Sequence, residues 1–304
     1  MLEVSGIEKS FGDVAAVKGV SLKAAPGQVT AIIGPNGAGK STTFRIVCGL
    51  LQPDRGNVFW KGADLRACLK QRQLGFLPEE RGLYQEIRVR ELAIYWAQLR
   101  EVDQRPAERV DHWLEKVGLT AKRKAFVRDL SKGNQQKLQL AVTMLHNPDL
   151  LVLDEPFSGL DPINQELVCS LLEEQKRRGA VVVLSAHQLA LVEQLADRTF
   201  IINGGRVADD QVRGAARPAK AWTVSFFTPD PDAVAQHVRG NRGHVITVEP
   251  GRVRAAFPGL SPEAFLTACA NVVAAARVVD FEVEREGLHQ RYLHAVSPRE
   301  TAGS

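Results

Sequence analysis

The sequence has few of the features that mark secreted, metal-binding or membrane-spanning chains. Its four cysteines, Cys48, Cys68, Cys169 and Cys269, are widely spaced in apolar segments, which favours reduced, buried thiols over disulfides or a metal site. The longest apolar runs are far shorter than the roughly 20 residues that a membrane helix needs. The first residues lack the basic start and apolar run of a secretory signal, so we expect a cytosolic protein.

An excess of charge of one sign is also missing. Over 304 residues the formal net charge is +4, which is too small and too scattered to predict a nucleic-acid partner, although it is compatible with an anionic membrane surface. The chain is 44% apolar, an ordinary share for a folded protein with a substantial core. We therefore expect one large domain and one smaller domain.

The clearest positive signal is a G-x-x-x-x-G-K-[ST] motif between an apolar strand at 29–33 and a helix at 41–50. The motif consists of Gly34, Pro35, Asn36, Gly37, Ala38, Gly39, Lys40 and Ser41. Its glycines let backbone N–H groups approach phosphates, Lys40 can reach the β- and γ-phosphates, and the Ser41 hydroxyl can bind Mg²⁺. The motif predicts a nucleoside triphosphate site; the alternative, a glycine turn before a core helix, loses weight beside the later motifs.

Two further apolar runs end in side chains suited to phosphate chemistry. Residues 150–153 lead into Asp154 and Glu155, and residues 180–184 lead into His187. At the carboxyl edge of a parallel sheet, Asp154 would hold the Mg²⁺ shell, Glu155 would polarise the attacking water and His187 would reach the γ-phosphate. The alternatives are a strand that ends at an acidic turn and a histidine that only fills a surface or core position.

A polar segment, Ser131, Lys132, Gly133 and Asn134, precedes apolar residues at helical spacing. It predicts a helix that begins with Ser131 as N-cap. The hydroxyl, the exposed N–H groups and the helix dipole suit a second phosphate-binding surface, and the alternative is a capped surface helix.

Taken in order over residues 1–210, these segments resemble the ATPase subunit of an ATP-binding cassette (ABC) transporter. The match includes the loop to Thr42, the LSGGQ-like signature at 130–134, the Asp154–Glu155 strand end, the turn at 158–161 and the switch His187. The resemblance implies that Phe11 stacks on adenine and that Asp161 communicates across a dimer. Two copies would close head to tail, with each ATP between the loop of one chain and the signature of the other.

The chain departs from the family pattern at two places. Glu79 stands where a glutamine is usual, which adds a negative charge beside the γ-phosphate; Arg81 would compensate, and our hypothesis is that Glu79 keeps the metal-sensing role. Lys132 and Asn134 replace the commoner glycine and glutamine of the signature. Together with the run from Pro78 to Tyr84, they resemble the ATPase subunits of bacterial sodium-extrusion-type exporters.

The resemblance implies an ATPase that uses ATP and Mg²⁺ and drives a separately encoded transmembrane permease, at the cytoplasmic face of the membrane, as a homodimer or with a related subunit. The short stretch between Lys40 and Ser131 excludes the long coiled-coil insertion of chromosome-maintenance ATPases. A single loop and signature disfavour the tandem ribosome-associated members, and no nucleic-acid partner is expected. Two alternatives remain: an ATP switch that acts on a soluble or nucleic-acid partner, and, in view of Glu79, a catalytically idle subunit.

The expected fold is an α/β P-loop NTPase of the ABC type over residues 1–212, with a parallel core sheet, an antiparallel β subdomain and a helical subdomain at about 80–145. A basic, proline-containing linker is predicted at 213–220. The pattern of 221–304 resembles a small ferredoxin-like α+β domain. Its role would be dimer stabilisation, packing or regulation across the dimer. Its histidines are too dispersed to favour a metal site: His237, His244, His289 and His294.

Overall fold

The computed structural model describes residues 1–80, 82–102, 105–213, 221–284 and 288–296. The chain divides into two compact units, one formed by Met1–Arg213 with the chain end from Ala295, the other by Gly214–His294. Helix α10 (Leu288–Val296) spans this boundary. Apart from Arg213, the linker expected at 213–220 lies outside the described residues, as does Arg81.

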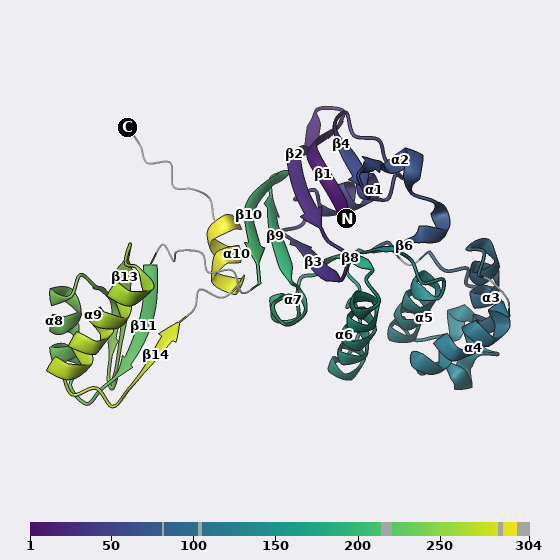
Figure 1. Ribbon diagram of the computed structural model, residues 1–304. Coiled ribbons are helices and arrows are strands. Elements are labelled where there is room, and N and C mark those ends of the chain that lie inside the picture. The colour runs from purple at the N-terminus through teal and green to yellow at the C-terminus, as the bar shows by residue number, and fades with distance from the viewer. Residues whose placement is uncertain (81, 103–104, 214–220, 285–287, 297–304) are drawn as a thin grey trace. The chain divides into compact units, whose positions relative to one another are not determined.

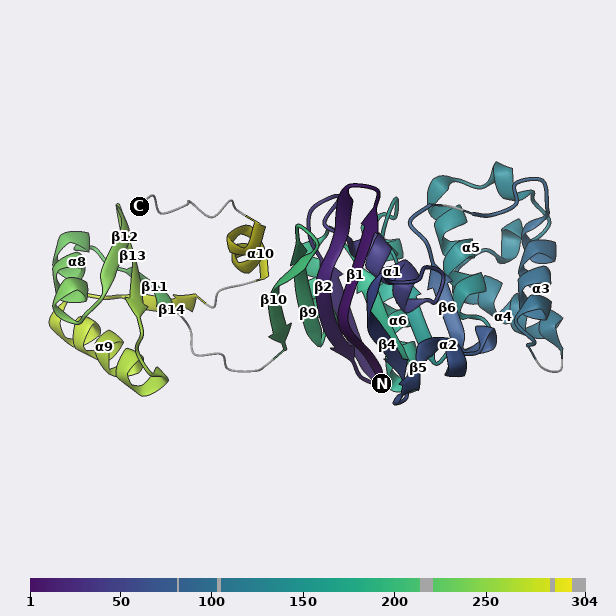
Figure 2. The ribbon, with the colours of Figure 1, turned by 90° about the horizontal axis from the view of Figure 1, so that it is seen from above.

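A six-stranded sheet forms the centre of the first unit (Figures 1 and 2). Its strands, in spatial order, are β10 (Arg206–Val212), β9 (Arg198–Asn203), β3 (Gln28–Ile33), β8 (Val181–Ser185), β7 (Leu150–Leu153) and β6 (Leu74–Leu77). All neighbours are parallel except β9 and β10. Strands β7 and β8 are buried along their whole length, which explains why their sequences are continuous apolar runs rather than alternating ones.

A four-stranded antiparallel sheet packs over helix α1 (Lys40–Val47), which follows strand β3 of the central sheet. Its spatial order is β2 (Val14–Ala24), β1 (Leu2–Phe11), β4 (Arg55–Trp60) and β5 (Ala63–Asp64). The buried core of this unit joins strand residues of both sheets to Phe44 of helix α1. Burial of one such side chain stabilises the fold by roughly 1.5–3 kcal/mol. Helix α1 is therefore held by packing against strands of both sheets.

The expected helix at 41–50 is shorter than its sequence pattern indicates. Gly49 has a left-handed φ of 71°, and its N–H donates to the Ile46 carbonyl, which is the usual glycine end of a helix. The expectation of four buried cysteines is correct for Cys48 and Cys269, whose thiol pKa values burial raises, whereas Cys68 and Cys169 are only partly buried.

Helices α3 (Val89–Leu99), α4 (Pro106–Lys116) and α5 (Lys132–Met144) gather beyond β6, at the end of the sheet opposite β10 (Figures 1 and 2). The other helices of this unit are α2 (Leu65–Cys68), α6 (Pro162–Arg177) and α7 (Leu189–Leu195). Within the ranges listed above, no helix is long and apolar enough to cross a membrane.

The second unit alternates strands and helices around one sheet. Its elements are β11 (Ala221–Phe227), α8 (Pro231–Gly240), β12 (His244–Glu249), β13 (Arg252–Pro258), α9 (Pro262–Ala275) and β14 (Asp280–Glu284). The strands are antiparallel in the order β12-β13-β11-β14. Helices α8 and α9 pack on one face of the sheet. There the rings of Trp222 and Phe265 stack, with their centroids 4.8 Å apart. The last strand of the sheet, β14, begins at Asp280.

Candidate functional site

The glycine-rich loop joins β3 to α1 and wraps around the ammonium group of its own lysine. Lys40 is buried, and its Nζ donates to the carbonyl oxygens of Gly34 at 2.8 Å and Pro35 at 3.1 Å. Gly39 has a φ of 101°, a left-handed conformation that side chains disfavour. No acidic side chain lies in the first turn of α1, so the helix dipole leaves this loop positive and ready for an anion.

The end of β9 and the turn between β9 and β10 pack against this loop. A Cβ atom at Gly34 would lie 2.1 Å from the Ile202 carbonyl oxygen, so only glycine fits there. The Gly205 N–H donates to the Ala38 carbonyl at 3.1 Å, and the Gly205 carbonyl accepts from the Lys18 N–H at 2.7 Å. The loop is therefore held by backbone contacts from the β9–β10 turn, which is itself hydrogen-bonded to β2.

The ends of β7 and β8 are tied together by one hydroxyl group. Ser185, which is fully buried, donates to Asp154 Oδ1 at 2.6 Å and accepts from the Glu155 N–H at 2.9 Å. Parallel pairing brings these ends side by side, because Leu153 lies opposite Leu184. The sequence thus delivers both carboxylates to the carboxyl edge of the sheet, the edge that also carries the loop.

Glu155 combines burial with a nearby imidazole. Its Oε1 lies 3.2 Å from His187 Nε2 and accepts no hydrogen bond, while the His187 side chain is 53% exposed. Burial raises the pKa of Glu155; His187 and Lys40 act in the opposite direction, and Asp154 adds to the rise. A carboxylate that is desolvated and incompletely hydrogen-bonded can accept a proton from water, which is the requirement for a general base.

The expected magnesium ligands all carry oxygen donors, which is the set that this hard cation prefers. Asp154 is buried and uses one carboxylate oxygen for the Ser185 hydroxyl. Glu79 is exposed just after β6, and the Asp154 N–H donates to the Leu77 carbonyl at 2.8 Å, which brings the two strand ends together. Ser41 lies in the first turn of α1. The hydroxyl and carboxylate oxygens of these residues are chemically suited to Mg²⁺.

The signature segment begins helix α5, as its N-cap pattern predicts. The Ser131 hydroxyl accepts from the Asn134 N–H at 3.3 Å, and the Ser131 and Lys132 side chains are exposed. Within the described residues, no hydrogen bond or ion pair links Ser131, Lys132, Gly133 or Asn134 to the loop at 34–42. The segment is presented to the outside of its own unit.

Two contacts connect α5 to the end of β7. Gln136, which is buried, donates through Nε2 to the carbonyls of Glu155 at 3.4 Å and Pro156 at 3.1 Å. A Cβ atom at Gly133 would lie 3.3 Å from the Gly159 carbonyl oxygen. Movement of the signature helix would therefore displace the backbone that carries Glu155.

The remaining predicted residues lie on the surface. Asp161 is the N-cap of α6, where it accepts from the Asn164 N–H at 2.9 Å and side-chain amide at 2.8 Å; these hydrogen bonds lower the pKa of Asp161. The Phe11 ring is 51% exposed at the end of β1, with Lys9 Nζ 5.9 Å from its centroid. Asn36 and Gly37 are exposed, and Thr42 is half-buried.

Sequence reasoning missed Ser185 and Gln136. A signal for Ser185 exists, because it is the one polar residue of strand β8 and immediately precedes the Ala186–His187 segment. Gln136 gives no such signal: nothing in a polar helix start distinguishes a buried amide from an exposed one.

Comparison with known proteins agrees with this geometry. A family model described as ABC transporter matches residues 17–158. The chain is 35% identical to the uncharacterized ABC transporter ATP-binding protein YhaQ of Bacillus subtilis (strain 168), over 97% of this chain and 98% of that protein. It is also 35% identical to the Nod factor export ATP-binding protein I of Rhizobium etli, over 67% of this chain and 66% of the relative.

Among solved structures, that of the ATP binding subunit of an ABC transporter superposes with a TM-score of 0.65 and 26% identity, over 88% of this chain and 99% of the other. The P-loop fold with mixed α/β sheets is therefore confirmed. Because the match to YhaQ extends over nearly the whole length of both chains, this protein belongs to the family of ABC transporter ATP-binding proteins.

Proposed function

We propose that this protein hydrolyses ATP as a head-to-tail dimer and powers a separate membrane permease of the exporter type. The single observation that carries the hydrolytic role is the Glu155–His187 arrangement, in which a buried carboxylate oxygen without a hydrogen bond lies 3.2 Å from an imidazole nitrogen. The positive charge of Lys40 acts to lower the pKa of Glu155, so the phosphate-binding group and the proposed base belong to one site.

In this proposal Glu155 accepts the proton of the attacking water, and His187 orients the γ-phosphate and Glu155. Lys40 exchanges its loop carbonyls for phosphate oxygens, and the N–H groups from Gly37 to Thr42 surround the phosphates. Ser41 and Asp154 would hold Mg²⁺, with Glu79 as a third oxygen donor. The cation would neutralise charge on the phosphates when bound.

The dimer follows from where the signature lies. Ser131, Lys132 and Asn134 form a helix start suited to phosphate, yet they have no described contact with the loop of their own chain. A second copy would complete the site by placing this helix start on the γ-phosphate. Asp161 is the N-cap of α6, close in sequence to Gly159, which contacts Gly133; this supports a role for Asp161 in transmitting closure between copies.

The exporter and permease assignments rest on relatives. One relative is named for Nod factor export. A sodium- or drug-efflux type is supported by two runs of this sequence, PEERGLY at 78–84 and LSKGNQQK at 130–137. A permease partner would place the protein on the cytoplasmic face of the membrane. For the second unit, the strand order β12-β13-β11-β14 supports a ferredoxin-like domain over 221–304 that stabilises or regulates the dimer.

ATP hydrolysis by two inactive variants, alone and mixed, tests the composite site. Lys40→Ala removes the loop charge, and Ser131→Arg blocks the signature; each is expected to be inactive alone. Half of randomly mixed dimers contain one of each chain, and one of their two sites is intact, so the mixture should recover roughly a quarter of the wild-type rate.

Two outcomes would contradict the proposal. A site formed within one chain gives no recovery on mixing, and a Glu155→Gln variant that retains wild-type turnover removes Glu155 as the base, because loss of a general base costs about 10²–10⁴-fold. Ser170→Ala, at an exposed position of α6, is the control for purification and folding. Co-purification of the wild-type protein with a membrane protein of about six apolar spans tests the permease partner.

A further inference from the structure

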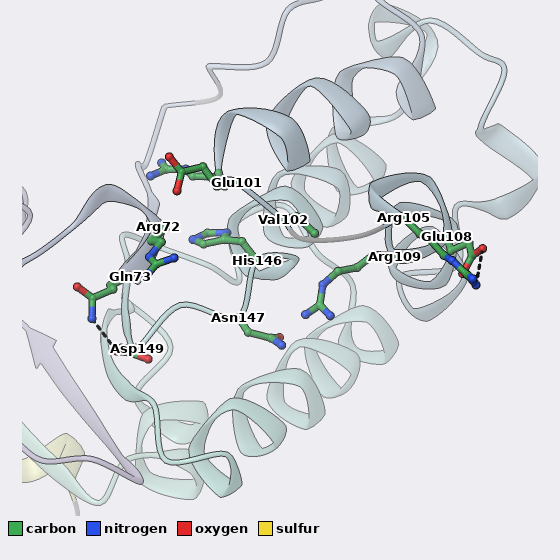
Figure 3. A pocket seen from close by; sticks show the side chains of 11 residues that line it. Arg72, Gln73, Glu101, Val102, Arg105, Glu108, Arg109, His146, Asn147 and Asp149 are labelled. Atoms are coloured by element: carbon green, nitrogen blue, oxygen red, sulfur yellow. Dashed lines mark hydrogen bonds and ion pairs between the residues drawn. The ribbon is translucent and has the colours of Figure 1, made fainter.

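A second concave region lies at the edge of the central sheet remote from the loop. A cavity of about 640 Å³ is lined by residues that include Gln73 and Asp149, just before β6 and β7 (Figure 3). The loop and Glu155 lie at the other edge, where the strands end. Its described lining comes from the turn before β6, the connection from α3 into α4, and the segment between α5 and β7. The volume falls within the range of ordinary small-ligand sites.

Arginine dominates the lining. Arg72, Arg100, Arg105 and Arg109 all face this cavity, and Val102 is the one apolar side chain among the described lining residues. Figure 3 shows the Arg109 guanidinium extended toward Asn147 and His146, while Arg105 pairs with Glu108 at the far end, at 3.3 Å. A lining of this kind selects for charge rather than for an apolar or aromatic group.

Three of these guanidinium groups have no carboxylate partner among the described residues. Arg100 donates one hydrogen bond to the Gln71 carbonyl at 2.8 Å, and Arg109 donates through Nε to the Leu145 carbonyl. Arg72 makes no ion pair within the described part of the chain. Each guanidinium has five N–H donors, so most of the donor capacity remains available to a ligand.

The carboxylates of the lining do not neutralise these charges. Asp149 is held by Lys61 at 2.9 Å and by Gln73 at 3.0 Å, and Glu108 is taken by Arg105. Glu101 is exposed and offsets one charge. Among the described residues, the unpaired arginines therefore leave the lining with an excess of positive charge.

His146 lies beside these arginines and has one ring nitrogen without a hydrogen-bond partner. A phosphate oxygen can pair with that nitrogen only through a proton. The Leu74 carbonyl can only accept, so His146 donates to it through Nε2 at 3.0 Å and leaves Nδ1 as an acceptor. That Nδ1 is buried and has no hydrogen-bond partner. Burial and the neighbouring Arg100, Arg109 and Arg178 lower the pKa of His146 to about 4, which keeps the ring neutral near arginines without a counter-anion.

We infer that this cavity is a binding site for a compact polyphosphate, with Arg72, Arg100 and Arg109 as the ligands of at least two phosphate groups. Planar guanidinium groups bind phosphate oxygens in pairs, which a single monovalent anion cannot fully exploit. The site is separate from the ATP loop. Because it does not rest on the proposed ATPase activity, absence of hydrolysis would leave this inference unaffected.

Calorimetric titration of the full chain with tripolyphosphate tests the inference. In a Lys40→Ala background, which weakens the loop, we expect one tripolyphosphate to bind per chain. Arg72→Gln/Arg109→Gln should raise its Kd by at least about tenfold per guanidinium. Arg66→Gln/Arg239→Gln, at two exposed arginines without described ion pairs, is the matched control and should leave the Kd unchanged.

A Lys pair separates charge from fork geometry: Arg72→Lys/Arg109→Lys should bind better than the Gln pair and worse than the wild type. Equal binding by the Gln pair and its control would overturn the inference, as would complete loss of binding in Lys40→Ala alone. Sedimentation with phosphatidylglycerol vesicles that depends on the same arginines, without tripolyphosphate binding, would assign the site to lipid headgroups and would also overturn it.

Discussion

The hydroxyl of Ser185 offers the sharpest test of how the catalytic edge is built. Ser185→Ala removes a 2.6 Å hydrogen bond to a carboxylate and leaves the Glu155 N–H without its 2.9 Å acceptor, all within a fully buried environment. A hydrogen bond to a charged group contributes about 1.5–3 kcal/mol, and an orphaned buried N–H costs about 1–3 kcal/mol. We therefore expect the free energy of unfolding to fall by about 3–5 kcal/mol.

Urea denaturation measures this change, and ATP turnover below the unfolding transition measures its effect on Glu155. Turnover should fall at least about tenfold, because the backbone that carries the proposed base loses its anchor. Ser170→Ala removes a 2.7 Å hydrogen bond to the Leu167 carbonyl at an exposed position and should change stability by less than about 0.5 kcal/mol. Equal effects of the two substitutions would refute the reasoning.

Three further expectations concern the loop and two buried ionisable groups. Gly34→Ala would place a methyl carbon 2.1 Å from the Ile202 carbonyl oxygen and should cost about 3 kcal/mol or more, whereas Gly37→Ala meets open space and should cost only about 1–2 kcal/mol for its φ of 75°. Urea denaturation measures the loss of unfolding free energy in each variant. Equal losses would contradict the predicted clash with the Ile202 carbonyl. Burial raises the pKa of Glu155, so Glu155→Gln should raise the melting temperature near pH 7; below the ordinary pKa of 4.5 both side chains are neutral and the gain should vanish. A gain independent of pH would speak against a desolvated carboxylate. Burial lowers the pKa of His146 from 6.5 to about 4. The free energy of unfolding should therefore fall by about 3 kcal/mol as the pH drops from 6.5 toward 4, because the unfolded chain binds the proton first. If His146→Gln loses stability over this pH range as the wild type does, His146 is not responsible.

The nucleotide site was predictable from the sequence because its parts are local. The loop, the Asp154–Glu155 strand end and His187 each sit at a strand end that apolar patterning reveals, and parallel pairing brings such ends together. The family and the P-loop fold follow from the same motifs. The roles of individual residues, Glu79 included, stay predictions.

The arginine-lined cavity could not be predicted in this way. Its residues are drawn from Arg72 to Asp149 and belong to no motif, so only the three-dimensional arrangement brings them together. The same holds for Gln136, whose partners lie on another element. Helix ends are a smaller example: the apolar pattern continues past Val47, but the left-handed Gly49 ends α1.

The contact between the β9–β10 turn and the phosphate loop affects where this chain tolerates insertions. Turns between neighbouring strands usually accept insertions, because few contacts depend on them. The turn at Gly204–Gly205 differs, because the N–H of Gly205 donates to the Ala38 carbonyl and the carbonyl of Gly205 accepts from the Lys18 N–H. A tag inserted there would weaken nucleotide binding without altering any residue of the phosphate motif. Fusion points are therefore better sought elsewhere, and a screen for tolerated insertions should show this short turn as an intolerant site.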